Sequence, residues 1–271
     1  MKQFIFILTF FFVVHTTFSY NPFWVRIDKK LIKNIVKLDK NSPKTVEQYF
    51  KTQKIQKCDT TKNSLGFGWA MWSPSVGGGY ISISATFYYY NNNIVSYTIT
   101  PEMPNEKRLI DRYKAWYQNS FTFDKETILP FIYKEEKILR PLKEYKGVLT
   151  TQMISPKILE YMTPNSGITY GYSGGYAAQL LSNRKTFIEI KNNLTNDQVI
   201  FLMYSINPAS RLTAIEYYLQ HKDNFSNYTE LDEWVEINFK EIPEVHTLSG
   251  CILRKYDTRT LVLMYSTMVD R

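Results

Sequence analysis

The chain has 271 residues, of which 44% are hydrophobic, and a formal net charge of +8. This apolar content is ordinary for a globular protein, and the length is sufficient for a sizeable core. Beyond the N-terminus no apolar run approaches the roughly 20 residues that a helix needs to span a bilayer, which excludes a later transmembrane helix.

The first nineteen residues have the layout of a secretory signal peptide. Lys2 gives a positive start, and residues 4–14 are apolar except for one threonine. Small residues, Thr17 and Ser19, stand at the positions that precede a cleavage site. We therefore predict cleavage after Ser19 and a secreted or periplasmic protein, with an uncleaved signal anchor as the alternative.

After cleavage the chain would comprise residues 20–271, a length that suits one large domain or two small ones. We predict a single α+β domain. Within it, residues 20–57 form a basic helical segment, and the chemistry of the sequence changes at residue 58, where the main body begins.

Positive charge is concentrated in residues 26–57, where ten basic residues against three acidic ones give a formal charge of +7. Such a basic segment can bind anionic lipid, polysaccharide or another polyanion. Nucleic acid is not an expected partner of an exported protein. The alternative is a solvated helix face that aids solubility. The candidate polyanion-binding residues are Lys29, Lys30, Lys33 and Lys37.

Two cysteines remain after signal removal, Cys58 and Cys251. In an oxidising compartment they can form a disulfide that ties the beginning of the mature chain to its end. Together with His221 and His246 they would make a Cys₂His₂ set, but no pair has the close spacing that is typical of zinc sites. No metal and no cofactor is therefore predicted.

The N-terminal half is expected to contain two helices and a β-hairpin. Apolar residues recur at helical spacing over residues 28–38, and a second helix begins with Ser42 as its N-cap and Pro43 in its first turn. Residues 80–90 alternate between apolar and polar side chains, asparagines follow, and residues 94–100 read as the returning strand.

The remaining segments predict segregated helices and strands, which is typical of an α+β fold. The C-terminal strands are expected to share one antiparallel sheet with the hairpin near residues 80–100, which would bring Cys58 near Cys251. Helices are predicted at 104–118, at 124–145 with breaks at the prolines, from 156 and from 177, and strands at 234–239, 250–254 and 260–265.

Residues 195–220 predict an α-hairpin, with a helix on either side of Asn207 and Pro208. With Arg211 three residues after the proline, this segment resembles one helical hairpin of a HEAT-type repeat. The resemblance covers about 25 residues and no second copy follows, so it implies a single hairpin and not a solenoid.

Residues 171–175, Gly-Tyr-Ser-Gly-Gly, resemble the nucleophile elbow of α/β-hydrolases. The resemblance implies that Ser173 is a nucleophile, with His246 as base and Asp232 or Glu233 as the acid that orients it. The alternative is a plain turn before a helix, with Ser173 as the N-cap.

These patterns favour an exported, non-catalytic protein that binds a partner at the cell envelope or outside the cell. The partner itself is unknown; an anionic envelope component or another protein would fit. The alternative function is an exported serine hydrolase that uses Ser173.

Overall fold

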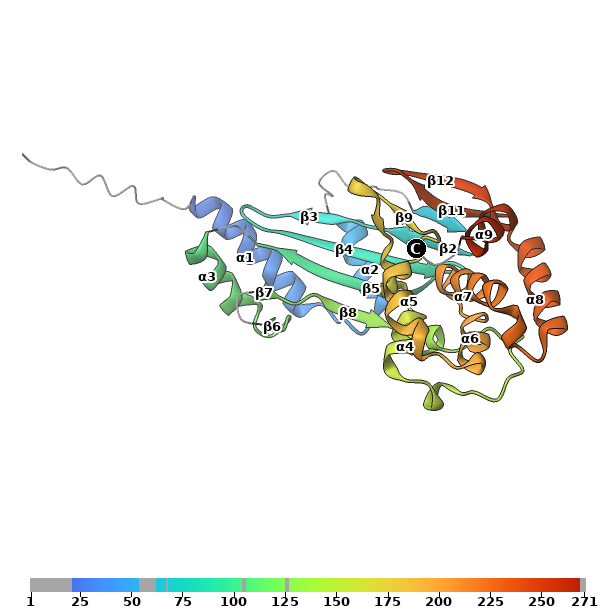
Figure 1. Cartoon of the computed structure of the whole chain (residues 1–271). Coiled ribbons are helices and arrows are strands. Elements are labelled where there is room, and N and C mark those ends of the chain that lie inside the picture. The colour runs from blue at the N-terminus through green and yellow to red at the C-terminus, as the bar shows by residue number, and fades with distance from the viewer. Residues whose placement is uncertain (1–20, 54–61, 67, 104–105, 125–126, 269–271) are drawn as a thin grey trace, which may run out of the picture.

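The computed structural model describes residues 21–53, 62–66, 68–103, 106–124 and 127–268. The expected signal peptide and Cys58 lie outside these ranges, so export and the disulfide stay predictions. The described residues form helices and antiparallel sheets, which confirms the α+β class. Figure 1 shows a long sheet toward one end of the molecule and a group of helices at the other.

The long sheet is antiparallel, with strand order β1-β2-β4-β5-β8 and with β3 also paired to β4. The β4–β5 hairpin confirms the predicted one. Asn91 and Asn92 turn it with φ values of 47° and 64°, a left-handed conformation that asparagine tolerates. The strands are β1 Asn63–Gly66, β2 Trp69–Trp72, β3 Ser75–Gly77, β4 Ser82–Tyr90, β5 Asn93–Glu102 and β8 Phe131–Lys134.

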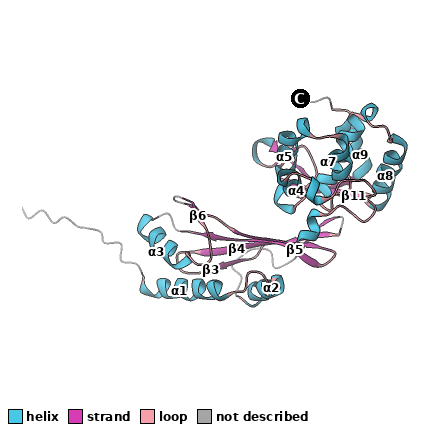
Figure 2. Ribbon diagram, turned by 90° about the horizontal axis from the view of Figure 1, so that it is seen from below, coloured by secondary structure: helices cyan, strands magenta, loops and turns pink. Residues whose placement is uncertain are grey.

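Three helices pack against this sheet, namely α1 Pro22–Lys37, α2 Pro43–Thr52 and α3 Lys107–Tyr117. Figure 2 shows α1 and α2 one after the other along one face of the sheet. Alternate residues of β4 from Ile83 to Tyr89 are buried in the same cluster as Ile35 of α1 and Phe50 of α2. The period-two pattern therefore reflects one covered face of the sheet.

The second half of the chain folds around a separate hydrophobic cluster. Most of α7 is buried in it, and α6 with α7 forms the predicted α-hairpin. A capping box of Thr195 and Gln198 begins α6. The helices are α4 Pro156–Tyr161, α5 Ser182–Ile190, α6 Asn196–Leu202, α7 Pro208–Gln220, α8 Tyr228–Glu241 and α9 Thr258–Ser266.

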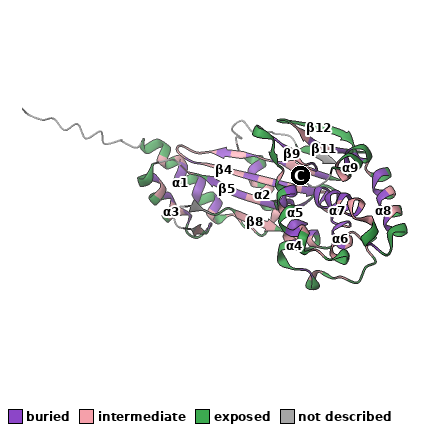
Figure 3. Cartoon of the chain, viewed as in Figure 1, coloured by how far each residue is buried: buried purple, intermediate pink, exposed green. Residues whose placement is uncertain are grey.

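Shorter elements connect these parts. The short strands pair as β6 Phe123–Asp124 with β7 Thr127–Ile128, β9 Ser173–Gly174 with β10 Gln179–Leu180, and β11 Glu244–Ser249 with β12 Ile252–Asp257. Along its whole length β12 is exposed, as Figure 3 shows. The 3-10 helices are η1 Glu136–Leu139, η2 Thr151–Met153, η3 Pro164–Ser166, η4 Tyr176–Ala178, η5 Lys191–Asn193 and η6 Lys222–Asn224.

The helix predicted over residues 124–145 is wrong. This segment contains β8, which extends the sheet by pairing with β5 so that Phe131 lies opposite Ile99. Aromatic and β-branched residues favour a strand, and Pro130 is tolerated next to an edge strand. Pairing with an existing sheet therefore outweighs the weak helical pattern.

The strand predicted over residues 234–239 is also wrong, because these residues belong to α8. The buried side chains of α8 are Leu231, Trp234, Val235, Asn238 and Phe239, spaced three and four residues apart. Alternation over a few residues was a poor guide here, since the longer window has the helical period.

The C-terminal hairpin lies earlier than predicted. It consists of β11 and β12 around Gly250, which has a φ of 58°, and residues 258–266 form α9 instead of the second strand. The carboxylate of Asp257 accepts a 2.7 Å hydrogen bond from the Thr260 amide and so caps α9. This hairpin is a sheet of its own, which corrects the prediction of one shared sheet.

Candidate functional site

Ser173 lies in a small β-hairpin. It opposes Leu180 across the β9–β10 pair, and the chain turns between them at Gly175, where φ is 74°. The helix that follows, α5, has Leu181 as its N-cap, so the N-cap role predicted for Ser173 is wrong. The predicted helix at this point is replaced by the second strand, β10, and by the start of α5 at Ser182.

Asp232 and His246, the other two residues of the hydrolase hypothesis, lie on α8 and β11. Asp232 is engaged elsewhere: its Oδ1 accepts a 2.7 Å hydrogen bond from Tyr218 Oη, and Lys222 pairs with its Oδ2. Burial acts to raise the pKa of Asp232, but the bonds from Lys222 and Tyr218 outweigh it and hold that pKa below its usual value.

The Nδ1 atom of His246 is buried without a hydrogen-bond partner in the described part of the chain. No hydrogen bond among the described residues joins Ser173, Asp232 and His246. Cys251 is an exposed free thiol there, and its predicted partner Cys58 is outside the described ranges.

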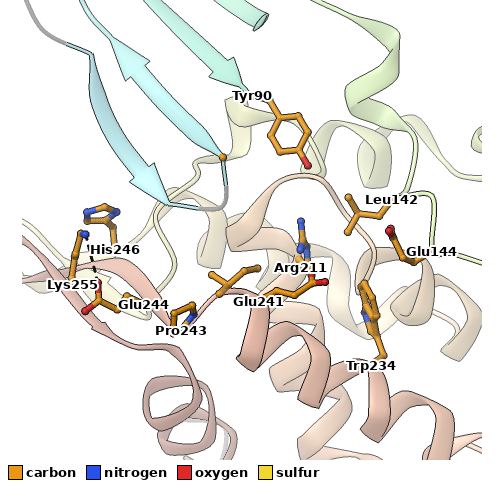
Figure 4. A pocket seen from close by; sticks show the side chains of 12 residues that line it. Tyr90, Leu142, Glu144, Arg211, Trp234, Glu241, Pro243, Glu244, His246 and Lys255 are labelled. Carbon is orange, nitrogen blue, oxygen red and sulfur yellow. Dashed lines mark ion pairs between the residues drawn. The ribbon is translucent and has the colours of Figure 1, made fainter. Parts of the chain in front are cut away.

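A cavity of about 510 Å³ lies where the end of the sheet meets the helical part. In Figure 4 the side chains of Tyr90, at the end of β4, and Arg211, on α7, point toward one another across it. His246 and Lys255 line its other side, and Lys255 Nζ lies 3.5 Å from Glu244 Oε2.

The charges in this cavity do not favour a ligand of either sign strongly. Among the described residues that line it, two cationic side chains, Arg211 and Lys255, stand against three carboxylates. The carboxylates are Glu144, Glu241 and Glu244.

Arg211 also stabilises the local structure through hydrogen bonds. Its Nε donates a 2.8 Å hydrogen bond to the Ser205 carbonyl, and its Nη1 donates a 3.3 Å bond to Asn238 Oδ1. Burial lowers the pKa of Arg211 to about 10. The arginine that made the segment resemble a repeat hairpin therefore links the α6–α7 loop to α8.

A more coherent surface lies on α1, and we call it the basic face. All of its residues are exposed, and at 3.6 residues per turn they fall within about 100° of the helix circumference. The one acidic residue of the helix, Asp28, is on the opposite, buried side. The basic face consists of Arg26, Lys29, Lys30, Lys33 and Lys37.

Asp28 fixes the orientation of α1. Its Oδ1 accepts a 2.6 Å bond from the Gly79 amide, and its Oδ2 accepts bonds from the Tyr80 amide at 3.0 Å and from Tyr113 Oη at 2.6 Å. A Cβ at Gly79 would lie 2.4 Å from Trp24 Cβ, so glycine permits this close approach. The buried side of the helix is thereby held on the sheet, and the basic face is turned outward.

Two aromatic side chains stand at the start of the same helix and were not part of the sequence prediction. Phe23 is 62% exposed and Trp24 is 45% exposed. The helix begins at Pro22 and not near residue 28, because Asn21 accepts a 3.0 Å bond from the Phe23 amide as N-cap. The Asn-Pro pair was the signal that would have placed this start.

Other site classes gain no support from the described residues. No three His, Cys, Asp or Glu side chains there are grouped to hold a metal ion, and no helix among those residues is long and apolar enough to cross a membrane. No family model, curated protein or solved structure matches the chain.

Proposed function

We propose that this is an exported, non-catalytic protein that attaches to an anionic component of the cell envelope, the headgroups of anionic lipids, through the basic face of α1. One observation carries the proposal: five exposed cationic side chains share one side of a single helix whose only carboxylate is buried. Such an arrangement gives one surface of the protein a field of one sign.

The physics of adsorption supports a surface attachment. A basic side chain near an anionic lipid surface contributes about 1 kcal/mol of binding free energy. Phe23 is exposed at the N-terminal end of the helix and lies close to the edge of the basic face. An aromatic ring in that position can enter the headgroup region while the lysines remain in water.

The test is the binding of the purified protein to vesicles of phosphatidylcholine with and without phosphatidylglycerol. A variant with Lys29, Lys30, Lys33 and Lys37 all changed to glutamine loses about 4 kcal/mol of this attraction and should bind anionic vesicles about 1,000-fold more weakly. The matched control carries the same four changes at exposed lysines outside α1, namely Lys143, Lys146, Lys185 and Lys240.

The control variant should bind as the original protein does, and salt at about 1 M should release both from the vesicles. An equal loss of vesicle affinity in the two variants would mean that binding follows the net charge of the protein and not the basic face. Binding that survives both the α1 changes and high salt would refute the proposal.

A further inference from the structure

A second cavity, of about 710 Å³, lies between α5, α7 and the end of α9, away from the basic face. Its volume is in the range of small-molecule sites, roughly 300–1,000 Å³. Gln220 on α7 holds the end of α9 against the cavity, because its Nε2 donates hydrogen bonds to the backbone carbonyls of Tyr265 at 3.2 Å and Met268 at 3.4 Å. We call it the α5–α7–α9 cavity.

Apolar side chains form most of the wall of this cavity, including Phe187 and Tyr217. At its rim Ile188 is 38% exposed and Met268 is 48% exposed. Exposed aliphatic side chains beside a concave aromatic wall gain free energy when an apolar molecule covers them.

The polar part of the cavity is a buried ion pair. Arg184 donates from Nη1 to Glu216 Oε1 at 2.7 Å and from Nη2 to Glu216 Oε2 at 2.5 Å, and Tyr170 Oη donates to the same Oε2 at 2.8 Å. Both oxygens of Glu216 are therefore occupied, and its charge is compensated from two sides.

Arg184 has hydrogen-bonding capacity left. Its Nε donates its single N–H to the Gly171 carbonyl at 3.3 Å. Nη1 and Nη2 carry two N–H groups each, and each of these nitrogens uses one of them on Glu216, so one N–H group is left on Nη1 and one on Nη2. No acceptor for these two is found among the described residues. Among the described residues that line the cavity, the charged side chains are those of Arg184, Lys191 and Glu216.

We infer that the α5–α7–α9 cavity binds an amphipathic organic anion, with an apolar chain against Phe187, Ile188 and Met268 and a carboxylate head toward Arg184. The two unused N–H groups of Arg184 favour an anionic acceptor, and Glu216 repels it little because both of its oxygens already accept hydrogen bonds. The inference is independent of the lipid-surface proposal, which concerns α1 on the other part of the molecule.

The experiment is a calorimetric titration of the purified protein with dodecanoate below its micelle concentration, compared with dodecanol. Dodecanoate should bind at one site, and dodecanol at least about tenfold more weakly because it lacks the charged acceptor. Absence of dodecanoate binding to the folded protein, or equal binding of dodecanol, would overturn the inference.

The decisive variant is Ile188→Glu, because a change at Arg184 would break the buried ion pair and disturb folding. A carboxylate at the rim repels the anion, so the affinity for dodecanoate should fall at least about tenfold. Ile237→Glu is the matched control, since Ile237 is 42% exposed on α8 and does not line the cavity. Equal affinity of the two variants would contradict the site.

The lysines of α1 offer dodecanoate a competing place to bind. The variant with Lys29, Lys30, Lys33 and Lys37 changed to glutamine should therefore keep its affinity for dodecanoate while losing affinity for anionic vesicles. Loss of dodecanoate binding in this variant would move the interaction to α1 and refute the cavity, whatever the vesicle result.

Discussion

The indole Nε1 of Trp69, in the sheet, donates a 2.9 Å hydrogen bond to the backbone carbonyl of Ile206, just before α7. The two residues are 137 positions apart in the chain. Trp69 is only 2% exposed, and it shares a small cluster with Val95, Ile138 and Ile168. This contact joins the sheet to the helical part of the molecule.

We expect Trp69→Phe to lower the free energy of unfolding by about 1–3 kcal/mol, because the Ile206 carbonyl loses its donor in a buried setting. Urea denaturation measures the change. Trp116→Phe, at a half-buried tryptophan of α3, serves as the comparison and should cost less. A larger loss at Trp116 would contradict the role given to Trp69.

The carboxylate of Asp28 is a second structural anchor. Asp28→Ala would leave three donors without their acceptor, and we expect a loss of about 3 kcal/mol or more. Tyr113→Phe removes only one of these bonds and should cost about 1 kcal/mol. Thermal unfolding followed by circular dichroism gives both values, and an Asp28→Ala protein as stable as the original would refute the anchor.

The Arg184–Glu216 pair predicts a non-additive result. Glu216→Leu leaves a buried guanidinium without its counter-charge and should cost about 3–5 kcal/mol. The double variant Arg184→Met, Glu216→Leu removes both charges and should recover most of that loss. A double-mutant cycle measures the coupling, and a double variant less stable than Glu216→Leu would show that the pair is not the source of the effect.

Glu47 predicts a dependence of stability on pH. Its Oε1 accepts a 2.7 Å bond from Tyr89 Oη and lies 2.8 Å from Lys51 Nζ. Burial acts to raise the pKa of Glu47, but the bonds from Lys51 and Tyr89 outweigh it, and the net pKa is lowered. A pKa lowered in the folded state stabilises the protein above the unfolded-state pKa, and this contribution disappears as pH falls through the folded-state pKa.

The difference in unfolding free energy between the original protein and Glu47→Gln should therefore shrink from neutral pH to about pH 3. Denaturant titrations at several pH values test this. A difference that does not change with pH would mean that the Glu47 charge contributes nothing.

The hydrolase hypothesis has a direct test at Ser173. A non-catalytic protein predicts that a fluorophosphonate probe does not label this serine, and that Ser173→Ala leaves the labelling pattern unchanged. Labelling that disappears in Ser173→Ala would instead support the serine hydrolase.

Elements with strong local signals were the ones that could be predicted. Pro43 in the first turn of α2, the Ser155-Pro156 start of α4 and the Thr195 capping box each act within a few residues, so the sequence is a sufficient guide to them. The segment that became β8 lacked such a signal. Its conformation depends on pairing with β5, which lies about 30 residues earlier in the chain, and a local pattern does not report that pairing.

The candidate functional surfaces also differ in whether local sequence or long-range packing forms them. Four of the five residues of the basic face could be placed together from the sequence, because Lys29, Lys30, Lys33 and Lys37 belong to the predicted helix and the helical period decides which side chains share a side. Arg26 joined them only in the structure, where the helix begins at Pro22. The α5–α7–α9 cavity and the Trp69 contact were decided only by the tertiary structure. They join residues that are distant in the chain, and their geometry comes from how the helices and the sheet pack.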